Sequence, residues 1–463
     1  MRKCAVGAAF FFVGVSLVRA TGRGFDGVGG GAANHAYTGG YADADAGNSG
    51  EGSVLGYGTD AGNDSDAVQP KSSESLKRFD TQFFDMFDTV TVLSAYAGDQ
   101  GTFEEFAQEF ARELRVYHEL YDIYHDYAGV NNIKTINDMA GVAPVAVDAK
   151  ILDLLEFSKE MHALTQGRVN VAMGSVLALW HQYRDAAGAD PSNSELPPMD
   201  ALRAAAQHMD IDLVIIDRTA GTVFLADPDM RLDVGAVAKG YALQRVCEGV
   251  TMANTAVDEA VANAAVDGAV ANGATQAAAA GAAAPGVPAV WGVGGGYTGE
   301  NSAGHGAGAA ARLGIPAFCA SVGGNVKTVG MKEPQAAGGA KEPWKVGIQN
   351  PDLLGDKTYL YMVPMADLSL VTSGGYQRYY TVGGKRYHHI IRPDTLMPWD
   401  MYESVSILCE DSGLADALST AVFNMYPDEG MALVEGLDGV EALWIMPDGS
   451  AVMTSGFRAE APR

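Results

Sequence analysis

Two adjacent histidines, an arginine and an aspartate lie in the short stretch HHIIRPDTLMP, residues 388–398. Histidine is a common metal ligand and is also the side chain whose charge changes near neutral pH, so this stretch is compatible with a metal pair, an acid–base site or a turn. Neighbouring side chains on a strand point to opposite faces, which disfavours one ion shared by His388 and His389. A proton-transfer role for His389 and a simple hairpin hydrogen bond both remain open.

A set of hard oxygen donors is predicted in GLADALSTAVFNM, residues 413–425. If this segment is helical, Asp416 and Thr420 stand at positions i and i+4 on one face. A carboxylate, a hydroxyl and a nearby backbone carbonyl suit Mg²⁺, which keeps its other positions for water and phosphate. The spacing alone is equally that of an ordinary helix with an acid in its first turn and a threonine on its surface.

Two glycine-containing stretches could approach an anionic ligand closely. In RLDVGAVAKGYALQRV (231–246), small residues lead into a helix that begins near Lys239, and a helix start with a nearby lysine suits an anion. In SVGGNVKTVG (321–330), a strand enters Gly-Gly-Asn, which forms either a plain turn or a backbone contact to phosphate or ribose. Taken alone, neither stretch distinguishes ligand binding from packing.

Hydrophobic periodicity places these stretches among mixed strands and helices without regular βαβ alternation, which predicts an α+β fold. Helical spacing predicts helices at 102–127, 148–165, 240–250 and 414–425. Alternation and β-branched residues predict strands at 84–95, 213–217, 222–225, 344–348, 368–371, 379–382 and 404–408. Hairpin turns are predicted at 218–221 and 383–384.

The charge balance excludes nucleic acid as an expected partner. The 463 residues carry a formal net charge of −26, with a pI near 4.6, and no local basic patch is evident. An acidic protein that binds a phosphorylated ligand must neutralise it locally, with a divalent cation or a few placed Lys and Arg residues. Beyond the first twenty residues the cysteines number three, at 247, 319 and 409, and their wide spacing predicts buried thiols with no disulfide framework and no CxxC metal motif.

The N-terminus and two regions of biased composition predict the domain organisation. Residues 1–20 combine a basic start, an apolar run and Val18-Arg19-Ala20, which is typical of a cleaved secretory signal. We therefore expect export to the periplasm or cell surface, and an uncleaved signal would instead tether the protein to the outer face of the cytoplasmic membrane. Residues 21–75 read as a disordered Gly/Ala/Asp/Ser-rich stalk, and 251–312 as an Ala/Gly-rich insertion within one folded domain at 76–463.

From Phe84 to Met425 the chain resembles the ApbE-type flavin transferases, which move FMN from FAD onto a Thr or Ser of a target protein. The resemblance rests on nine blocks that follow one another in the family's order. They are FDTVTV (87–92), YDIYHDYAGVNNIKTIN (121–137), QGRVNVAMGSVLALWHQYR (166–184), LDVGAVAKGYA (232–242), VGGNVKTVG (322–330), WKVGIQNP (344–351), TSGGYQRYY (372–380), HIIRPDTLMP (389–398) and ADALSTAVF (415–423).

The resemblance implies an ApbE-like flavin transferase fold in a single catalytic domain, with Mg²⁺ as cofactor and FAD as substrate. It implies that Mg²⁺ is held by the backbone carbonyl of Ala236 and by the side chains of Asp416 and Thr420. Flavin contacts are implied at Phe87, Tyr124, Arg168, Val169, Asn170, Asp233, Lys239 and Ile390. Of the histidines, His389 is the expected proton acceptor, and His389 and Asp416 are the expected catalytic residues.

The implied reaction is a Mg²⁺-assisted transfer of FMN from FAD to a Thr or Ser hydroxyl, with release of AMP. The expected partner is an acceptor protein, most readily an exported electron-transfer protein. Two alternatives use the same site. One is a Mg²⁺-dependent FAD pyrophosphatase, in which water replaces the acceptor hydroxyl and FMN and AMP are released. The other is a protein that binds FAD without turning it over.

The sequence departs from the family's commoner pattern at three positions. Asn170 stands where an Asp is common, which removes a charge but keeps a hydrogen-bonding side chain. Phe87 stands where Met is common, a conservative change for a group that covers a ring. Arg392 stands where Asp is common, which reverses the charge next to His389. Arg392 either pairs with Asp394 or binds a phosphate, and both alternatives are open at this point.

Overall fold

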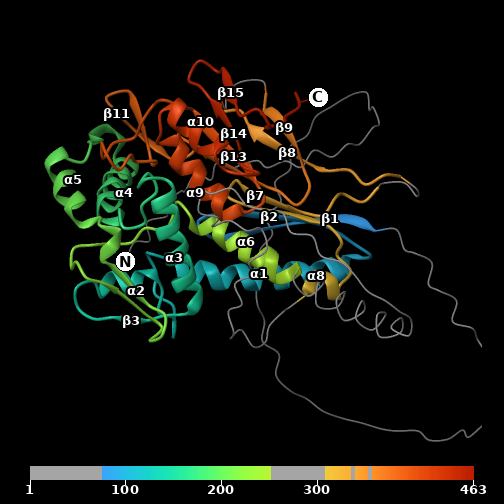
Figure 1. Ribbon diagram of the computed structural model, residues 1–463, viewed down its shortest axis with the longest axis horizontal. Helices are drawn as coiled ribbons and strands as arrows, with labels where there is room; N and C mark the ends of the chain where they lie inside the picture. The colour runs from blue at the N-terminus through green and yellow to red at the C-terminus, as the bar shows by residue number, and fades with distance from the viewer. Residues whose placement is uncertain (1–75, 252–307, 335–338, 353–356, 463) are drawn as a thin grey trace, which may run out of the picture. The chain divides into compact units, whose positions relative to one another are not determined.

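Antiparallel strands build the main sheet of the computed structural model, which describes residues 76–251, 308–334, 339–352 and 357–462 (Figure 1). Within these residues the sheet has eight strands. Their spatial order is β1 (Lys77–Met86), β2 (Thr89–Ala97), β6 (Phe318–Val322), β7 (Asn325–Val329), β10 (Ser369–Gly374), β13 (Ser404–Cys409), β14 (Glu441–Ile445) and β15 (Ala451–Met453).

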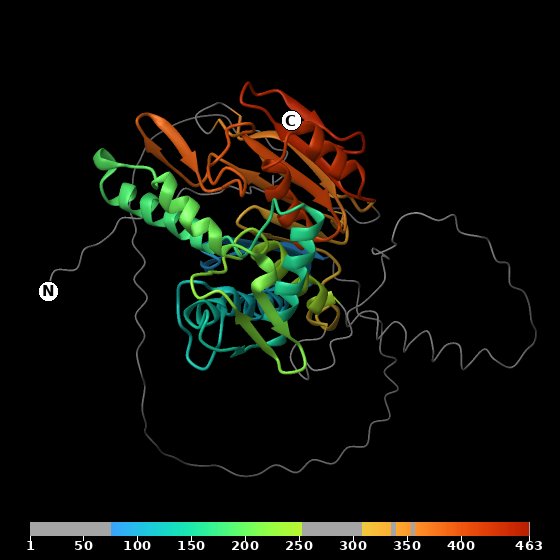
Figure 2. The same cartoon turned by 60° about the vertical axis from the view of Figure 1, so that its left-hand side comes forward.

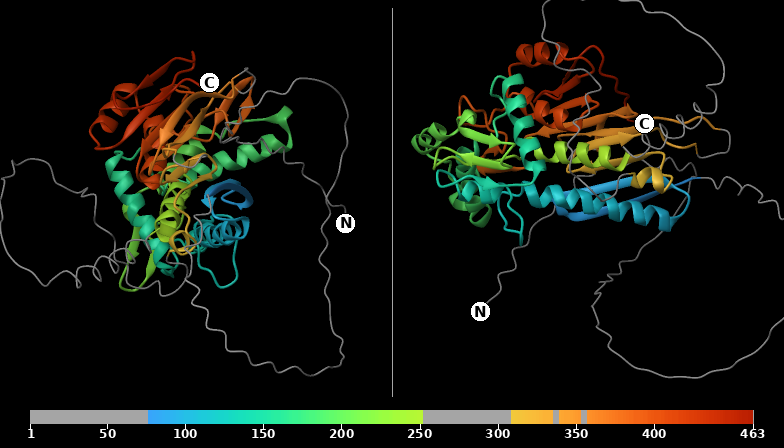
Figure 3. Two further views of the ribbon diagram at one scale, coloured as in Figure 1. Left: turned by 90° about the vertical axis from the view of Figure 1, so that its right-hand side faces the viewer. Right: turned by 60° about the horizontal axis from the view of Figure 1, so that its bottom comes forward.

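The central strands are buried on both faces because a layer covers each side of the sheet. On β6 the side chains of Phe318 and Ala320 pack with the helices, whereas Cys319 between them packs with the opposite layer. The helical layer contains α1 (Gln100–Tyr121), α6 (Ala238–Thr251) and α9 (Ser412–Phe423), and the opposite layer contains the hairpin of β8 (Trp344–Gln349) and β9 (Tyr359–Met365) (Figure 3). Successive side chains of a strand point to opposite faces of the sheet, so one strand contributes side chains to the hydrophobic core on each face.

Helices α6 and α9 approach each other closely, and Gly240 permits this approach. A Cβ atom at position 240 would lie 2.2 Å from the carbonyl oxygen of Ser412 and 2.5 Å from Cβ of Asp416. These distances are shorter than any van der Waals contact, so only glycine fits at this crossing without displacing a helix. The crossing brings the first turn of α6 against the side chain of Asp416.

Further elements lie beside the main sheet. They include a small sheet in the order β3 (Val145–Ala146), β5 (Thr222–Leu225) and β4 (Val214–Asp217). Helices are α2 (Ile133–Asp138), α3 (Ala149–Leu164), α4 (Gly174–Ala189), α5 (Met199–Ala205), α8 (Ala309–Arg312) and α10 (Pro427–Glu435), with short 3₁₀ turns η1 (Pro191–Asn193), η2 (Ala206–His208) and η3 (Ile211–Leu213). The hairpin of β11 (Tyr379–Val382) and β12 (Lys385–His388) packs against α4 (Figure 2).

The mixed α+β architecture is confirmed, as are the helices predicted from apolar spacing at 148–165, 240–250 and 414–425. The helix predicted at 102–127 is α1, but it ends at Tyr121, and residues 122–127 form a loop. The helix predicted at 148–165 is α3; Asp148 caps its start, and the residues after its end, Gln166 and Gly167, have φ of 51° and 79°. The strand predicted at 84–95 is wrong in one respect. The chain turns at Phe87 and Asp88, which have φ of 53° and 50°, and the segment forms the end of β1 and most of β2.

Several predictions fall partly or wholly outside the described residues. The signal at 1–20, the stalk at 21–75 and residues 252–307 of the insertion lie there. The last residues of the predicted insertion form α8, where Ala309 and Ala310 are buried and Arg312 pairs with Glu105 and Glu109. The prediction for Cys247, Cys319 and Cys409 is confirmed, since all are buried free thiols. In the described part of the chain, no helix combines the length and apolar character that crossing a membrane requires.

Candidate functional site

Asp416 is a buried carboxylate at the contact of α9 with α6. Its Oδ2 accepts a hydrogen bond of 2.8 Å from the backbone N–H of Gly240. Burial raises the pKa of Asp416, and the charge of Lys239 and the hydrogen bond from Gly240 offset part of that rise. A buried carboxylate without a close cation is costly, and a bound divalent cation would relieve that cost. The chemistry of this position therefore fits a hard cation.

The helical spacing of Asp416 and Thr420 is confirmed, because both lie on α9. A small group of hydroxyls surrounds Thr420. Oγ of Ser373, on β10, lies 2.8 Å from Oγ of Ser419 and 3.5 Å from Oγ1 of Thr420. The hydroxyls of Ser373, Ser419 and Thr420 thus lie together between α9 and β10, and Asp416 lies one turn before Thr420 on the same helix. Hydroxyl and carboxylate oxygens are the donors that Mg²⁺ prefers.

The segment that leads into α6 supplies the other predicted groups of this region. Oδ1 of Asp233 accepts 2.9 Å from the N–H of Gly235, which holds the turn that contains Ala236. Nζ of Lys239 donates 3.1 Å to the carbonyl of Gly235 and forms no ion pair within 4 Å among the described residues. Lys239 is thus a cation at the start of a helix, where backbone N–H groups also favour an anion.

His389 directly follows β12 and is held by Arg378. Its backbone N–H donates 3.1 Å to the carbonyl of Arg378, and its Nδ1 lies 3.2 Å from the same oxygen. Loss of solvation lowers the pKa of His389 to about 3, and the positive charges of Arg378 and Lys239, together with His388, act in the same direction. At neutral pH the ring is therefore uncharged in the free protein.

Phe87 and Tyr124, two predicted flavin contacts, are joined by one hydrogen-bond network. The N–H of Phe87 donates 3.2 Å to Nδ1 of His118, and Nε2 of His118 lies 3.3 Å from the hydroxyl of Tyr127. That hydroxyl donates 2.8 Å to Oδ2 of Asp122, whose Oδ1 accepts 2.6 Å from the N–H of Tyr124. The network fixes the main chain at both aromatic residues.

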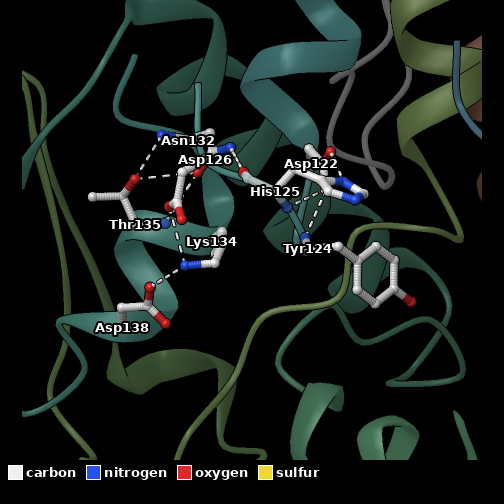
Figure 4. A network of polar contacts seen from close by, with 8 residues as sticks. All are labelled: Asp122, Tyr124, His125, Asp126, Asn132, Lys134, Thr135 and Asp138. Atoms are coloured by element: carbon white, nitrogen blue, oxygen red, sulfur yellow. Dashed lines mark hydrogen bonds and ion pairs between the residues drawn. The ribbon is translucent and has the colours of Figure 1, made fainter. Parts of the chain in front are cut away.

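Asp122 is the centre of this network. Burial acts to raise its pKa, but hydrogen bonds from Tyr124, Tyr127 and His125 outweigh burial, and the net pKa is lowered. Figure 4 shows the Asp122–His125 pair and the ring of Tyr124, which is directed away from that pair. The same view shows the adjacent capping of α2 by Asn132, whose side chain accepts from Thr135. The segment 122–138 is thus well ordered by its own polar groups.

Tyr124 is 51% exposed, and its hydroxyl lies 3.1 Å from Nδ1 of His181 on α4. Burial of the hydroxyl end raises the pKa of Tyr124 to about 12, and the negative charge of Asp233 acts in the same direction. Burial lowers the pKa of His181, which Asp233 partly opposes. An exposed ring face with an anchored hydroxyl suits stacking on a flat heterocycle.

The predicted residues 168–170 have three different environments. Nη1 of Arg168 donates 2.8 Å to Oδ2 of Asp394, whereas the side chain of Val169 is buried in the core and offers a ligand only its backbone. The amide of Asn170 donates 2.8 Å to the carbonyl of Met209 and accepts 2.9 Å from the N–H of Ala172. An Asp could accept but not donate here, so the loop uses the amide that distinguishes Asn from Asp.

The structure favours the local pairing of Arg392 over phosphate binding. Its Nε donates 2.9 Å to Oδ1 of Asp394, and its guanidinium carbon lies 4.0 Å from the ring centre of Trp399. Hydrogen bonds from Arg392 and Arg168 lower the pKa of Asp394 to about 2. Arg392 is buried, and Ile390 before it is also buried, with 6% of its surface exposed. The reversed charge at 392 is therefore neutralised within its own loop.

The two adjacent histidines do not face each other as a metal pair. His388 is buried, its Nε2 lies 3.1 Å from the carbonyl of Trp399, and its ring packs edge-on against Phe423. A separate group with metal-ligating side chains lies among the described residues, made of His208, Asp227 and Asp229. In that group Nδ1 of His208 lies 2.8 Å from Oδ2 of Asp227, so the histidine already has a carboxylate partner.

The structure brings most of the predicted residues into one region. Lys239 acts on both Asp416 and His389, and Asp394 connects Arg168 to the loop that follows His389. Sequence reasoning did not single out three neighbours, His118, His181 and Arg378. His181 and Arg378 lie inside blocks of the family pattern, but no spacing marked them. Nη2 of Arg378 donates 3.3 Å to the carbonyl of Asp88 and so links the His389 side to the turn at Phe87.

Comparisons with known proteins agree with this arrangement. The sequence matches the ApbE family over residues 87–282 and 292–444. It is 30% identical to the FAD:protein FMN transferase of Treponema pallidum over 324 residues, which cover 68% of this chain and 71% of that protein. It is 24% identical to the protein of the same name from Klebsiella pneumoniae, over 76% of this chain and 87% of the relative.

Solved structures share the fold. The ApbE protein of Thermotoga maritima matches with a TM-score of 0.58 and 22% identity, over 82% of this chain and 97% of that structure. The flavin transferase ApbE of Vibrio cholerae matches with a TM-score of 0.57 and 19% identity, over 82% and 98%. The family match spans well over half of the chain and includes every residue assigned to the site above, and the chain therefore belongs to the ApbE family.

Proposed function

We propose that this protein is an FAD:protein FMN transferase, which moves FMN from FAD to a Thr or Ser hydroxyl of an acceptor protein and releases AMP. Its curated relatives carry this name and match it over more than two thirds of both chains. The observation that carries the proposal is the meeting of a buried carboxylate, Asp416, with a cation free of ion pairs, Lys239, near a neutral histidine, His389.

The residues present fit Mg²⁺. The carboxylate of Asp416, the hydroxyl of Thr420 and the carbonyl of Ala236 would hold it, and all three are hard oxygen donors. When bound, Mg²⁺ neutralises charge on the pyrophosphate and stabilises the leaving phosphate. Lys239 adds a second positive charge at the start of α6, where the pyrophosphate of FAD would bind.

His389 would take the proton of the acceptor hydroxyl. The hydroxyl oxygen forms a new bond to the phosphorus of the FMN half, and the bond from that phosphorus to the AMP oxygen breaks, so that AMP leaves as an anion. Burial is the main cause of the lowered pKa of His389 in the free protein, and the nearby cations Arg378 and Lys239 add to it. A bound pyrophosphate would offset the contribution of those two cations and so make His389 a stronger base than in the free protein.

One experiment distinguishes this function from its alternatives. The protein lacking residues 1–20 is incubated with FAD, Mg²⁺ and a candidate acceptor domain, and intact masses and free nucleotides are measured. An acceptor that gains FMN, together with free AMP, supports the transferase. Free FMN and AMP with an unmodified acceptor support the pyrophosphatase, and unchanged FAD supports a protein that only binds FAD.

The acceptor protein and the cellular location of this protein are also proposed. We infer that the protein is exported, because residues 1–20 have the composition of a secretory signal. From the resemblance to the ApbE-type flavin transferases we infer that its acceptor is an exported electron-transfer protein. Cell fractionation followed by N-terminal sequencing of the mature protein tests this. Recovery of the full-length chain in the cytoplasm would contradict it.

A further inference from the structure

Three hydroxyl side chains connect β10 to α9. Successive side chains of β10 point to opposite faces of the sheet, and Val371, two residues before Ser373, packs with side chains of α9. Ser373 points to the same face, where its Oγ lies 2.8 Å from Oγ of Ser419 and 3.5 Å from Oγ1 of Thr420. Oγ of Ser419 donates 2.9 Å to the backbone carbonyl of Asp416. We refer to Ser373, Ser419 and Thr420 as the hydroxyl chain.

The carbonyl of Asp416 fixes the direction of the hydrogen bonds in the hydroxyl chain. A hydroxyl has one hydrogen and two lone pairs, whereas a carbonyl oxygen only accepts. Because Ser419 gives its hydrogen to the carbonyl of Asp416, Ser373 must be the donor in its contact with Ser419. The hydrogen of Ser373 is then used, so Thr420 is the donor in the contact between Thr420 and Ser373. All hydrogens of the chain therefore point in one direction, from Thr420 towards the carbonyl of Asp416.

This direction decides which way the hydroxyl of Thr420 faces. A threonine in a helix often donates to the carbonyl four residues earlier, but here that carbonyl, of Asp416, accepts from Ser419. Among the described residues, Ser373 is the one hydrogen-bond partner of the Thr420 side chain. The separation of 3.5 Å is long for two hydroxyls, so the contact directs the hydrogen of Thr420 more than it fixes the side chain. With that hydrogen directed at Ser373, a lone pair of Oγ1 is left for a cation.

We propose that Ser373 is a positioning residue of the metal site, which accepts the hydrogen of Thr420 and so leaves the lone pairs of its Oγ1 to the cation. This role rests on the proposed function, since it takes Asp416 and Thr420 as Mg²⁺ ligands. Residues that orient a ligand without touching the metal typically change metal affinity roughly 10–100-fold when they are removed. Ser373 contributes a neutral and long contact, so its loss belongs at the lower end of that range.

The test measures metal binding separately from the reaction. Ser373→Ala removes the acceptor, whereas Ser373→Thr keeps a hydroxyl on a β-branched side chain, which suits a strand. Binding of Mg²⁺ to the FAD-free protein is measured by isothermal titration calorimetry. We expect Ser373→Ala to weaken binding about tenfold and Ser373→Thr to remain within about twofold of the unmodified protein. The melting temperature without Mg²⁺ should change little in either variant, because Ser419 keeps its bond to the carbonyl of Asp416.

Release of AMP from FAD is measured in parallel as a function of Mg²⁺ concentration. A residue that acts only through metal affinity changes the concentration that is needed, and saturating metal restores the rate. We therefore expect Ser373→Ala to need about tenfold more Mg²⁺ for half-maximal AMP release and to regain most of the rate at saturation.

Thr372→Val is the matched control on the same strand. Thr372 precedes Ser373 and also contacts a serine hydroxyl, since its Oγ1 lies 2.8 Å from Oγ of Ser406. Its side chain points to the opposite face of the sheet, which is the face of Leu370 and of the core beside β8 and β9. The loss of a hydroxyl contact on that face should leave Mg²⁺ binding unchanged.

Two results would overturn the role of Ser373 and leave the proposed function standing. One is equal Mg²⁺ affinity in Ser373→Ala and Thr372→Val, and the other is the same loss of affinity in Ser373→Thr as in Ser373→Ala. A lower melting temperature of Ser373→Ala with unchanged Mg²⁺ affinity belongs to the first result and would show a structural role only. If the unmodified protein neither bound Mg²⁺ nor transferred FMN, the proposed function itself would be wrong, and the role of Ser373 would fail with it.

Discussion

The two ends of the candidate site are built differently. At the acidic end, Asp416 and Lys239 lie on helices that cross at Gly240 on the main sheet, and main-chain packing sets their positions. At the aromatic end, Phe87 and Tyr124 lie on a turn and a loop, and a side-chain network through Asp122 holds them.

This difference in construction matches the role that each end of the site would have in the reaction. Charges that stabilise a reacting phosphate must be preorganised, since small displacements weaken electrostatic stabilisation sharply. A flat ring needs contact area and tolerates small shifts of its neighbours. Changes at the acidic end should therefore reduce turnover, whereas changes at the aromatic end should mainly weaken FAD binding.

Asp416→Asn should have the largest effect. It removes the anionic metal ligand and keeps the shape of the side chain, and we expect Mg²⁺-dependent turnover to fall on the order of 10³-fold. Because burial raises the pKa of Asp416, a neutral amide should also be easier to bury. The melting temperature without Mg²⁺ should therefore equal or exceed that of the unmodified protein.

Asp411→Asn is the control on the same helix, because Asn caps a helix as well as Asp does and Asp411 is the N-cap of α9. Asp411 also lies 3.6 Å from Arg245, so Asp411→Asn should leave turnover unchanged and lower the melting temperature only slightly. If Asp416→Asn lowered stability as well as activity, Asp416 would have a structural role in place of the proposed one.

Gly240→Ala should damage the acidic end through the helix crossing. The added methyl group meets the Ser412 carbonyl and Asp416, and overpacking of this kind costs about 1–3 kcal/mol in the free energy of unfolding. Half-maximal activity should require a higher Mg²⁺ concentration. Gly249→Ala on the same helix meets nothing within 4 Å and should be neutral or stabilising. If Gly240→Ala and Gly249→Ala had the same effect on stability and on the Mg²⁺ requirement, close packing at the helix crossing would not be the cause of the damage.

Tyr127→Phe should affect the aromatic end alone. It removes the hydroxyl that joins His118 to Asp122, and we expect KM for FAD to rise roughly fivefold while kcat changes less than about twofold. Tyr361→Phe on β9 lies outside the network and should leave both constants unchanged. A fall in kcat without a change in KM would show that the two ends do not separate as described.

Asn170→Asp should have the smallest effect. It restores the residue common in the family but loses the donor to the Met209 carbonyl, which should cost about 1 kcal/mol in unfolding free energy. Asn131→Asp loses a similar bond to the Ala146 carbonyl at an exposed position and should cost less. Urea unfolding measures both, and an equal cost would mean that the Asn170 contact has no special importance.

Local sequence signals predicted the parts of the fold that local interactions determine. Asp148 before an amphipathic run and Gln166-Gly167 after it predicted α3, and the spacing of Asp416 and Thr420 placed both on α9. The turn at Phe87 and Asp88 was missed because Phe is rarely found at positive φ and the alternating pattern continues across the turn, although Asp is among the residues that adopt positive φ more often.

Contacts between distant segments could not be predicted in this way. The Phe87–His118 bond joins residues 31 apart, and the choice between pairing and phosphate binding at Arg392 depends on where Trp399 and Asp394 lie. The roles of Arg378 and His181 likewise depend on elements that meet only in the folded chain. The family resemblance predicted which residues form the site, but the contacts that hold these residues were seen only in the structure.

The pairing of Arg168 with Asp394 has a consequence for the order of folding. These residues are 226 positions apart, and Asp394 also holds Arg392 beside His389. Closing so long a loop is entropically costly, so this contact is expected to form after the local hairpins and helices. Breaking it should accelerate unfolding more than it slows refolding. The loop after His389 would then be among the last parts of the domain to become ordered. Activity would appear only after the contact between Arg168 and Asp394 has formed.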